Sequence, residues 1–404
     1  MNCRFCGKEL FYEFIDLGSS PLSNSFLTEK ELNLPEVYYP LKLFVCDNCF
    51  LVQTDEYVKS KEIFNKNYVY FSSYSRTWLD HSKKFAEMII DKIKLNNKSL
   101  VVEVASNDGY LLQYFKEKNI PSIGIEPTKS TASIAKQKGL EIIEDFFGVN
   151  IANNIPKADL IIANNVLAHV PNINNFVEGL KIALKKNGTI TIEFPHLLNL
   201  IKYNQFDTIY HEHFSYFSFM TVKHIFKTHE LEIYDVEALD THGGSLRIYA
   251  KHMQDNSKTI NMNVFNMIEK EKKFGIDKIN CYTDFQIKIN LIKYKLLEYI
   301  IKIKLDGKII GGYGAAAKGN TLINYCGIKK DIINFVADLS PHKQGKFLPG
   351  SHIPVVPEIE IKLQKPNFIM IFPWNIKNEI MEQLKYIRKW NGKFILTMPS
   401  LKIE

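Results

Sequence analysis

The 404-residue sequence has no long hydrophobic run. No stretch approaches the ~18 uninterrupted apolar residues that a membrane-spanning helix needs. The first residues, MNCRFC, are polar or cysteine and do not form the apolar segment of a signal peptide. We therefore expect a cytoplasmic protein that does not associate with membranes.

The sequence also lacks a concentrated block of charge. Its 51 basic and 44 acidic side chains give a formal net charge of +7, and the lysines are scattered along the chain. Such a balance is weak support for a nucleic-acid partner, although it favours encounter with phosphate-bearing substrates. The hydrophobic content of 46% is typical of a folded globular protein, and the length predicts two to four domains.

Cysteine is scarce, but four of the six cysteines form two C-x-x-C pairs. Disulfides are disfavoured in a cytoplasmic protein, and this spacing matches a tetrahedral four-thiolate zinc site. Four thiolates leave no open coordination position, so the zinc should be structural. The long stretch between the pairs should form an inserted excursion that returns as a strand at residues 41–45. The predicted ligands are Cys3, Cys6, Cys46 and Cys49.

From Ser99 onward, short β-branched runs alternate with amphipathic stretches, which predicts βαβ units and a mainly parallel sheet. A helix is predicted at residues 175–185. Ligands of such sheets bind at the carboxyl ends of the strands, so the residues there are site candidates. The predicted strands are residues 100–105, 122–126, 141–143, 160–164 and 189–194.

The loop after the first strand, EVASNDG, differs from a dinucleotide-binding loop because Gly109 is its only glycine. Instead, an acidic residue stands at the end of each of three strands. Glu126 lies where a carboxylate accepts from a ribose diol, and Asp145 with Phe146 could contact an adenine. Single acids occur at strand ends by chance, but together they favour S-adenosylmethionine over NAD. The predicted donor-binding residues are Glu103, Ala105, Asn107, Gly109, Glu126, Asp145, Phe146 and Asn164.

Motifs along nearly the whole chain resemble one family. In addition to the cysteine pairs, the sequence contains LGSSPLSNSF, YFSSYS, EVASNDGYLL, GIEPT, NNVLAHVPN, EFPHLL, FDTIYHEHFSYFS, HGGSLR, GYGAAAKGNTLINYCGI, DLSPHKQGKFLPGSHIP and FPWN. The sequence thereby resembles S-adenosylmethionine-dependent sugar C-methyltransferases that act on nucleotide-linked 4-keto deoxysugars. The resemblance implies a class I, Rossmann-like α/β methyltransferase sheet (61–254) between a zinc-binding domain (1–60) and a helical connector with a C-terminal Rossmann-like substrate-binding domain (255–404).

Methylating a carbon next to a ketone requires a base for the α-proton, a donor for the enolate oxygen and a methyl group held in line. His213 in DTIYHEHF is the candidate base, because a histidine can accept a proton near neutral pH. Tyr210 could donate to the enolate oxygen or relay the proton, and Glu212 could orient an imidazole or bind substrate. His169 is a second polarising group. Alternatively, His211 and His213 could share a metal site or be ordinary surface residues.

The C-terminal segment contains a strand, a glycine turn and a helix in KIIGGYGAAAKGN, followed by Asp338 at the end of the next strand. A nicotinamide-dependent oxidoreductase would use such a turn, and this is the main alternative function. We assign the turn instead to the diphosphate of a sugar nucleotide. A zinc-bearing nucleic-acid-binding protein is a further alternative. The predicted substrate-binding residues are Tyr70, Tyr74, His242, Lys318 and Asn320.

Overall fold

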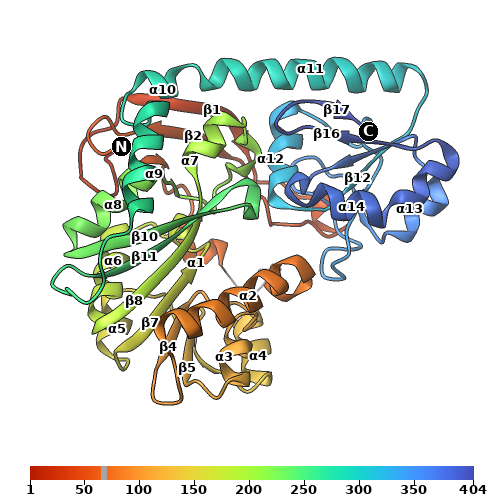
Figure 1. Ribbon diagram of the computed structural model, residues 1–404. Helices are drawn as coiled ribbons and strands as arrows, with labels where there is room; N and C mark the ends of the chain where they lie inside the picture. Colours follow the sequence, from red (N-terminus) through yellow and green to blue (C-terminus); the bar gives the residue numbers. More distant parts are fainter. Residues whose placement is uncertain (65–70) are drawn as a thin grey trace.

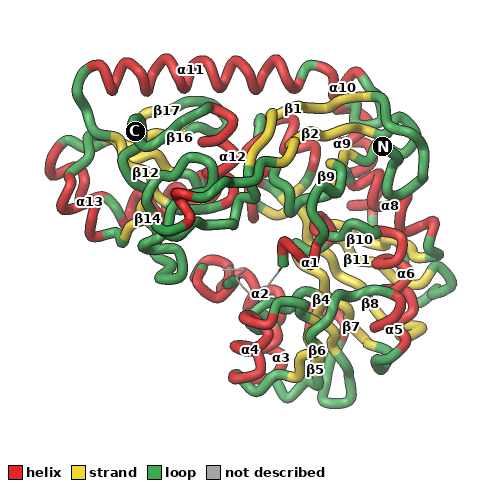
Figure 2. Tube along the Cα trace, turned by 180° about the vertical axis from the view of Figure 1, so that it is seen from behind, coloured by secondary structure: helices red, strands yellow, loops and turns green. Residues whose placement is uncertain are grey.

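The computed structural model describes residues 1–64 and 71–404, and its strands form three sheets (Figure 1). A small four-stranded sheet lies beside the long helix α11 (Phe285–Leu305), which runs along the edge of the molecule towards the C-terminal sheet. The same arrangement is seen from behind in Figure 2. Among the described residues, no helix is long and apolar enough to cross a membrane.

The N-terminal sheet is antiparallel and has the order β1-β2-β3-β9. Its first three strands are β1 (Tyr12–Ser20), β2 (Tyr39–Val45) and β3 (Val52–Thr54), so the predicted returning strand at 41–45 is the main part of β2. We call the segment between β1 and β2, residues 21–38, the excursion. It contains the short 3-10 helix η1 (Glu31–Asn33).

The fourth strand of this sheet comes from a distant part of the sequence. Strand β9 (Ser215–Tyr216) pairs with β3, with Tyr216 opposite Val52 and Ser215 opposite Gln53. The predicted domain boundary at 60/61 falls at the start of helix α1 (Ser60–Ile63). The N-terminal unit is therefore completed by residues that follow the central sheet in the sequence.

The central sheet has seven strands in the order β10-β11-β8-β7-β4-β5-β6, and β11 is antiparallel to both of its neighbours. All five predicted strands are present, whereas the β10–β11 hairpin was not predicted. The predicted boundary at 254/255 follows β11. The strands are β4 (Val101–Val104), β5 (Ser122–Ile125), β6 (Glu141–Ile143), β7 (Ala158–Asn164), β8 (Leu184–Pro195), β10 (Leu231–Leu239) and β11 (Ser245–His252).

Helices cover both faces of this sheet, which explains why its inner strands are continuous apolar runs. In β7, for example, Leu160, Ile161 and Ile162 are fully buried. The α-helices are α2 (Arg76–Ile93), α3 (Leu112–Glu117), α4 (Lys129–Gln137), α5 (Val149–Asn153), α6 (Ile173–Ala183), α7 (Leu197–Lys202) and α8 (Phe219–Thr228). The 3-10 helices are η2 (Ser72–Tyr74), η3 (Leu167–His169), η4 (Phe206–Thr208) and η5 (Thr241–Gly243).

Several predicted boundaries differ from the structure by one to five residues, and two of the differences have identifiable reasons. Strand β4 ends at Val104 because Ala105 adopts a left-handed conformation with φ of 57°. Helix α6 begins at Ile173, two residues earlier than predicted, because the Asn172 side chain caps it by accepting from the Asn175 amide at 3.1 Å. It ends at Ala183, where β8 begins.

The C-terminal unit is Rossmann-like, as predicted, with β12 at the centre of a sheet ordered β14-β13-β12-β15-β16-β17. Only β17 is antiparallel to its neighbour. The connector contains α9 (Met262–Phe274), α10 (Asn280–Thr283) and α11. The strands are β12 (Ile310–Tyr313), β13 (Val336–Ala337), β14 (Val355–Val356), β15 (Phe368–Ile371), β16 (Lys393–Leu396) and β17 (Lys402–Ile403). The helices are α12 (Ala317–Cys326), α13 (Ile359–Gln364), α14 (Lys377–Gln383), η6 (Trp374–Ile376) and η7 (Lys385–Trp390).

Candidate active site and zinc centre

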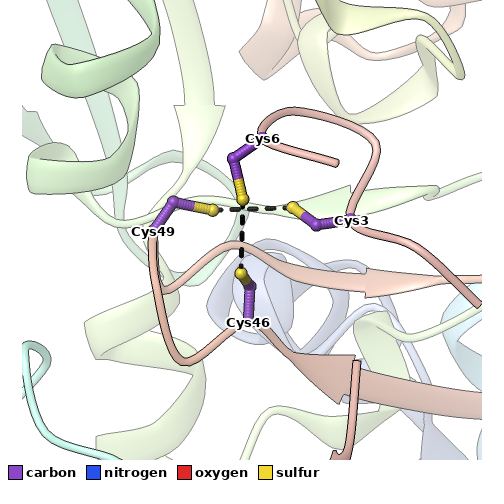
Figure 3. Close-up of side chains that lie close together, drawn as sticks. All are labelled: Cys3, Cys6, Cys46 and Cys49. Carbon is purple, nitrogen blue, oxygen red and sulfur yellow. Dashed lines mark hydrogen bonds between the residues drawn. The ribbon is translucent and has the colours of Figure 1, made fainter. Parts of the chain in front are cut away.

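The four paired cysteines meet at one point, with their sulfur atoms directed towards a common centre (Figure 3). All four Sγ atoms lie within 4.8 Å of one another, with 3.5 Å between Cys3 and Cys49 and 3.6 Å between Cys6 and Cys46. A tetrahedral zinc ion with Zn–S bonds near 2.3 Å would separate the sulfurs by about 3.8 Å. The geometry therefore fits a four-thiolate zinc site.

The residues around this centre connect it to the rest of the protein. The Gln53 amide donates to Cys3 Sγ at 3.2 Å, and its carbonyl oxygen accepts from the Arg4 backbone at 2.8 Å. The Arg4 guanidinium donates to the carbonyl oxygens of Pro171, at 3.1 Å, and Thr54. Hydrogen bonds around metal-ligating side chains orient those side chains. Here they also connect the cysteine cluster to Pro171, which lines the main cavity.

A cavity of about 820 Å³ lies at the carboxyl ends of the central strands and receives residues from all three units. We distinguish two parts of it. Its sheet end includes Ala105, Asn107, Glu126, Asp145, Phe146 and Asn164. Its turn end includes His169, Tyr210, Glu212, His213, His242 and Lys318. All of these residues were predicted site residues, and the fold brings them into one cavity.

At the sheet end, Glu126 organises the loop after β4. Its carboxylate accepts from the backbone amides of Asn107 at 2.9 Å and Thr128 at 2.8 Å. Burial raises the pKa of Glu126, and these hydrogen bonds oppose the rise. Asn164 ends β7 with a buried Oδ1 that has no hydrogen-bond partner among the described residues. This oxygen can accept from a polar ligand group, which fits a nucleoside-bearing donor.

The loop after β4 is held in an uncommon backbone conformation. Ala105 and Asn107 have φ of 57° and 50°, in the left-handed region that side chains rarely adopt. Two further cavity residues, Asn165 and His242, have φ of 54°. Each such residue costs on the order of 1 kcal/mol or more, and such strain is concentrated at functional sites.

Two predicted donor-binding residues, Glu103 and Gly109, do not line the cavity. Glu103 is fully buried in β4, where burial raises its pKa well above the usual range. Gly109 has φ of 75°, and a Cβ there would lie 2.3 Å from Leu140 Cδ1. Glycine is therefore required at this position by backbone conformation and packing.

The turn end is built around residues 207–214, which we call the YHEH turn. The ring centroids of Tyr210 and His213 lie 4.0 Å apart, and those of His169 and His213 lie 4.8 Å apart. Three groups capable of proton transfer or hydrogen bonding are thus adjacent in one cavity.

The hydrogen bonds of the two cavity histidines determine where their protons lie. His213 Nδ1 is 2.9 Å from the Thr208 carbonyl, and His169 Nδ1 is 2.7 Å from the Glu212 carbonyl. A carbonyl only accepts, so Nδ1 carries the proton and Nε2 carries the lone pair in each neutral ring. Burial lowers the pKa of His169 to about 4 and that of His213 well below its usual value. Both rings are therefore neutral proton acceptors at neutral pH.

His211 has different surroundings from His213, although the two are only two residues apart. Its Nε2 lies 3.1 Å from the Pro40 carbonyl, and its ring packs on Tyr39 at 5.9 Å. Within the described part of the chain, the cysteine cluster is the only group arranged to bind a metal. His211 and His213 belong to no cluster of three or more metal-ligating side chains among the described residues.

The C-terminal unit supplies a cation to the turn end. Lys318, in α12, lines the cavity and donates to Asn375 Oδ1 at 3.1 Å, and its Nζ lies 4.5 Å from the Trp374 ring centroid. The Trp374 indole in turn donates to Asp207 Oδ2 at 2.6 Å. Burial lowers the pKa of Lys318 and raises that of Asp207 to about 6.

His242 joins the central and C-terminal units at the same end. Its Nε2 accepts from the Asn165 side chain at 3.3 Å, and its ring centroid lies 5.1 Å from that of Trp78. Burial lowers the pKa of His242 to about 4. Its neighbour Gly243 packs so closely on Trp374 that a Cβ would lie 2.3 Å from the indole. This contact holds the His242 loop against the C-terminal unit.

Two of the other predicted substrate-binding residues, Tyr74 and Asn320, do not line the cavity. Tyr74 lies at the surface with 58% of its area exposed, and Asn320 is buried in α12. Tyr70 falls outside the described residues. The acid expected for a nicotinamide site, Asp338, instead accepts from the Ala315 amide at 2.7 Å and the Ser340 amide at 2.8 Å.

Asn24 is a cavity residue that sequence reasoning did not identify. It belongs to the excursion, and its side-chain amide donates to Glu212 Oε1 at 2.6 Å. The two residues are separated by 188 positions, so no local pattern indicated the contact. The only available signal was that Asn24 lies within the LGSSPLSNSF motif.

Three family models match successive parts of the chain. They are described as a putative zinc binding domain at residues 3–64, a methyltransferase domain at 75–236 and a C-methyltransferase C-terminal domain at 240–399. Together with the doubly wound sheet and its cavity, they define the class of the protein, an S-adenosylmethionine-dependent methyltransferase. S-adenosylmethionine and structural zinc are its cofactors.

A full-length relative identifies the family. The C-methyltransferase NovU of Streptomyces niveus is 31% identical over 406 residues, and the match covers 100% of this chain and 96% of the relative. The chain therefore belongs to the C-methyltransferase family with an N-terminal zinc unit, and the resemblance seen in its motifs is confirmed.

Similar solved structures match less than half of the chain. The magnesium protoporphyrin IX methyltransferase of Synechocystis with bound SAH has 13% identity and a TM-score of 0.36, covering 43% of this chain and 82% of its own. An S-adenosylmethionine-dependent methyltransferase of Clostridium acetobutylicum has 12% identity and a TM-score of 0.34, covering 42% and 90%.

Proposed function

We propose that this enzyme methylates a carbon adjacent to the keto group of a nucleotide-linked 4-keto deoxysugar. The observation that carries the proposal is the turn end of the cavity, where a tyrosine and two neutral imidazoles adjoin the methyl-donor pocket. The sugar class is supported by the motif resemblance and by a cation, Lys318, in the same cavity. The proposed domains are those predicted from the sequence: 1–60, 61–254 and 255–404.

The donor is proposed to occupy the sheet end. Glu126 would accept from the ribose hydroxyls, and Asp145 and Phe146 would contact the adenine. Asn164 has an unsatisfied buried oxygen beside this position. The loop at Ala105 and Asn107 would pass close to the methionine portion, whereas Glu103 and Gly109 would support the loop from behind.

The reaction begins with proton removal from the carbon next to the ketone. The lone pair on His213 Nε2 takes this proton, and the C–H electrons form an enolate. The Tyr210 hydroxyl donates to the enolate oxygen and stabilises its charge, while His169 can share the proton received by His213. S-adenosylmethionine, when bound, supplies an electrophilic methyl group on a sulfonium, and the nucleophilic carbon displaces S-adenosylhomocysteine.

The nucleotide part of the acceptor is proposed to extend towards α12. The N-terminus of this helix reaches the cavity at Ala316 and Ala317, where the helix dipole favours an anion. Lys318 adds a positive charge for the diphosphate. His242 would contact the sugar, and Asn320 would support α12 from inside. Tyr70 remains a proposed substrate contact, whereas the surface position of Tyr74 does not support that role.

The test is incubation of the purified enzyme with S-adenosylmethionine and a dTDP-4-keto deoxysugar. Mass spectrometry should show a product 14 Da heavier, and NMR should place the new methyl group on a ring carbon. Methylation of oxygen would overturn the proposed carbon chemistry. Reduction of the ketone with consumption of NADH would favour the oxidoreductase alternative.

A further inference from the structure

The turn end of the cavity is incomplete without the zinc unit. Strand β9 begins directly after the YHEH turn and pairs with β3 of the N-terminal sheet. The Thr54 amide of β3 also donates to the Phe214 carbonyl at 3.1 Å. The backbone that follows His213 is therefore fixed by the unit that carries the cysteines.

The excursion, which precedes the YHEH turn in the sequence, also contacts this turn. Asn24 lines the cavity, and its amide donates to the Glu212 carboxylate at 2.6 Å. A short hydrogen bond to a charged acceptor is stronger and more directional than a neutral one. Because the Glu212 carboxylate lies in the cavity wall, this bond determines which way one of its oxygens faces.

Asn24 is itself held in place by the C-terminal unit. Three residues further on, Leu27 exchanges backbone hydrogen bonds of 2.9 and 2.8 Å with Phe347. Later in the excursion, Glu36 accepts from the Gly350 amide at 2.9 Å. The segment is thus anchored beyond Asn24, which limits the freedom of the amide that contacts Glu212.

We infer that Asn24 is a positioning residue for methyl transfer, which orients the Glu212 carboxylate towards the acceptor. The zinc unit thereby contributes a side chain to the acceptor site in addition to its structural role. This inference rests on the proposed function, because it requires Glu212 to face the sugar. The hydrogen bond between Asn24 and Glu212 joins two units that are far apart in the sequence, and it would affect catalysis.

The first experiment is a double-mutant cycle with Asn24→Ala and Glu212→Gln. Losing a hydrogen bond to a charged group should lower kcat/KM by roughly ten- to a hundredfold in Asn24→Ala. If Asn24 acts through Glu212, the same change in the Glu212→Gln background should have a much smaller effect. Asn33→Ala, also in the excursion but not lining this cavity, is the matched control and should retain wild-type turnover.

The isosteric substitution Asn24→Asp gives a second test. At high pH its carboxylate would repel Glu212, whereas a protonated Asp would donate as the amide does. Its activity relative to wild type should therefore recover as the pH is lowered, and Asn24→Ala should show no such recovery. Zinc content and S-adenosylmethionine affinity should stay at wild-type values in both variants.

The outcomes separate this inference from the proposed function. Wild-type turnover in Asn24→Ala, or equal losses in both backgrounds of the cycle, would overturn the role of Asn24 alone. A loss of activity that only parallels a loss of zinc or of donor binding would also overturn it. If the wild type binds donor but methylates none of the nucleotide-linked ketosugars, the proposed function fails and the role of Asn24 fails with it.

Discussion

Burial has opposite effects on the proton affinity of two residues in the YHEH turn. It raises the pKa of Asp207 to about 6 and lowers that of His213 well below its usual value. The cause is the same in both cases, because a charged group loses hydration when it is buried. His213 therefore remains uncharged at neutral pH and is available to accept a proton.

Replacing His213 tests the proposed base. His213→Gln should lower kcat by roughly 10²- to 10⁴-fold, the usual contribution of a positioned acid or base. The affinity for S-adenosylmethionine, measured by calorimetry, should stay unchanged because the side chain lies at the turn end. His229→Gln is the control, since His229 pairs with Glu178 away from the cavity. Undiminished turnover in His213→Gln would remove it as the base.

Replacing Asp207 with a neutral residue should stabilise the folded protein by an amount that depends on pH. Its pKa is about 6 in the folded protein and 3.8 ordinarily, so above pH 6 the folded state contains a disfavoured charge. Asp207→Asn should therefore raise the melting temperature at pH 8, by an amount corresponding to at most about 3 kcal/mol. The gain should shrink as the pH falls from 6 to 4.

Thermal unfolding at several pH values measures this difference, with the exposed Asp331→Asn as control. The Asn side chain can still accept from the Trp374 indole, so this hydrogen bond is kept while the charge is removed. A difference between Asp207→Asn and wild type that does not vary with pH would contradict the elevated pKa.

At the scale of elements, the YHEH turn is held by neighbours from all three units. The Ala168 carbonyl of η3 accepts from the Phe214 amide at 2.8 Å, and Thr321 of α12 donates to the Ile209 carbonyl at 2.8 Å. Strand β3 holds the following strand β9. The turn has almost no regular structure of its own, so its conformation depends on these contacts.

Loss of zinc should therefore impair catalysis as well as the N-terminal fold. Cys46→Ser should bind less zinc, melt at a lower temperature and show reduced turnover, because the β3–β9 pairing would loosen. Cys281→Ser, which lies outside the cluster, should retain full zinc content. Metal analysis with thermal unfolding checks this expectation, and full zinc content in Cys46→Ser would contradict four-thiolate coordination.

The elements that the sequence predicted well are those with a strong local pattern. Strands β4 to β8 are apolar runs bounded by polar loops, and the position of the sheet end follows from them. The β10–β11 hairpin was not predicted, since its apolar residues alternate with charged ones such as Glu237 and Arg247, which pair with each other across the hairpin. Local backbone conformations, such as the left-handed conformation of Ala105, also ended elements at other positions than predicted.

Only part of the candidate site was predicted, because local motifs identify residues but not their tertiary contacts. Residue type and motif identified His213 and Lys318, but they could not show that His211 packs against Pro40 or that Gly109 lies behind its loop. Asn24 was missed because its role depends on a contact made across most of the chain. Local sequence indicates which residues can perform chemistry, whereas tertiary packing determines which of them reach the cavity.

At the scale of the whole molecule, the excursion connects the N-terminal and C-terminal units. Glu36 accepts from the Gly350 amide and pairs with His352 at 3.1 Å. Glu36→Ala should weaken this connection, and amide hydrogen exchange around residues 347–354 should accelerate by roughly tenfold or more. Glu29→Ala, exposed in the same excursion, should leave exchange unchanged. Unaltered exchange in Glu36→Ala would show that Glu36 does not hold the two units together.

The bond between Trp374 and Asp207 has a consequence for biosynthesis. Trp374 follows Asp207 by 167 positions, so it leaves the ribosome well after the YHEH turn. A nascent chain can fold its metal-binding unit and its donor pocket before then, but its YHEH turn still lacks the indole and Lys318. We therefore expect competence for methyl transfer to arise only after Lys318 and Trp374 have both been synthesised.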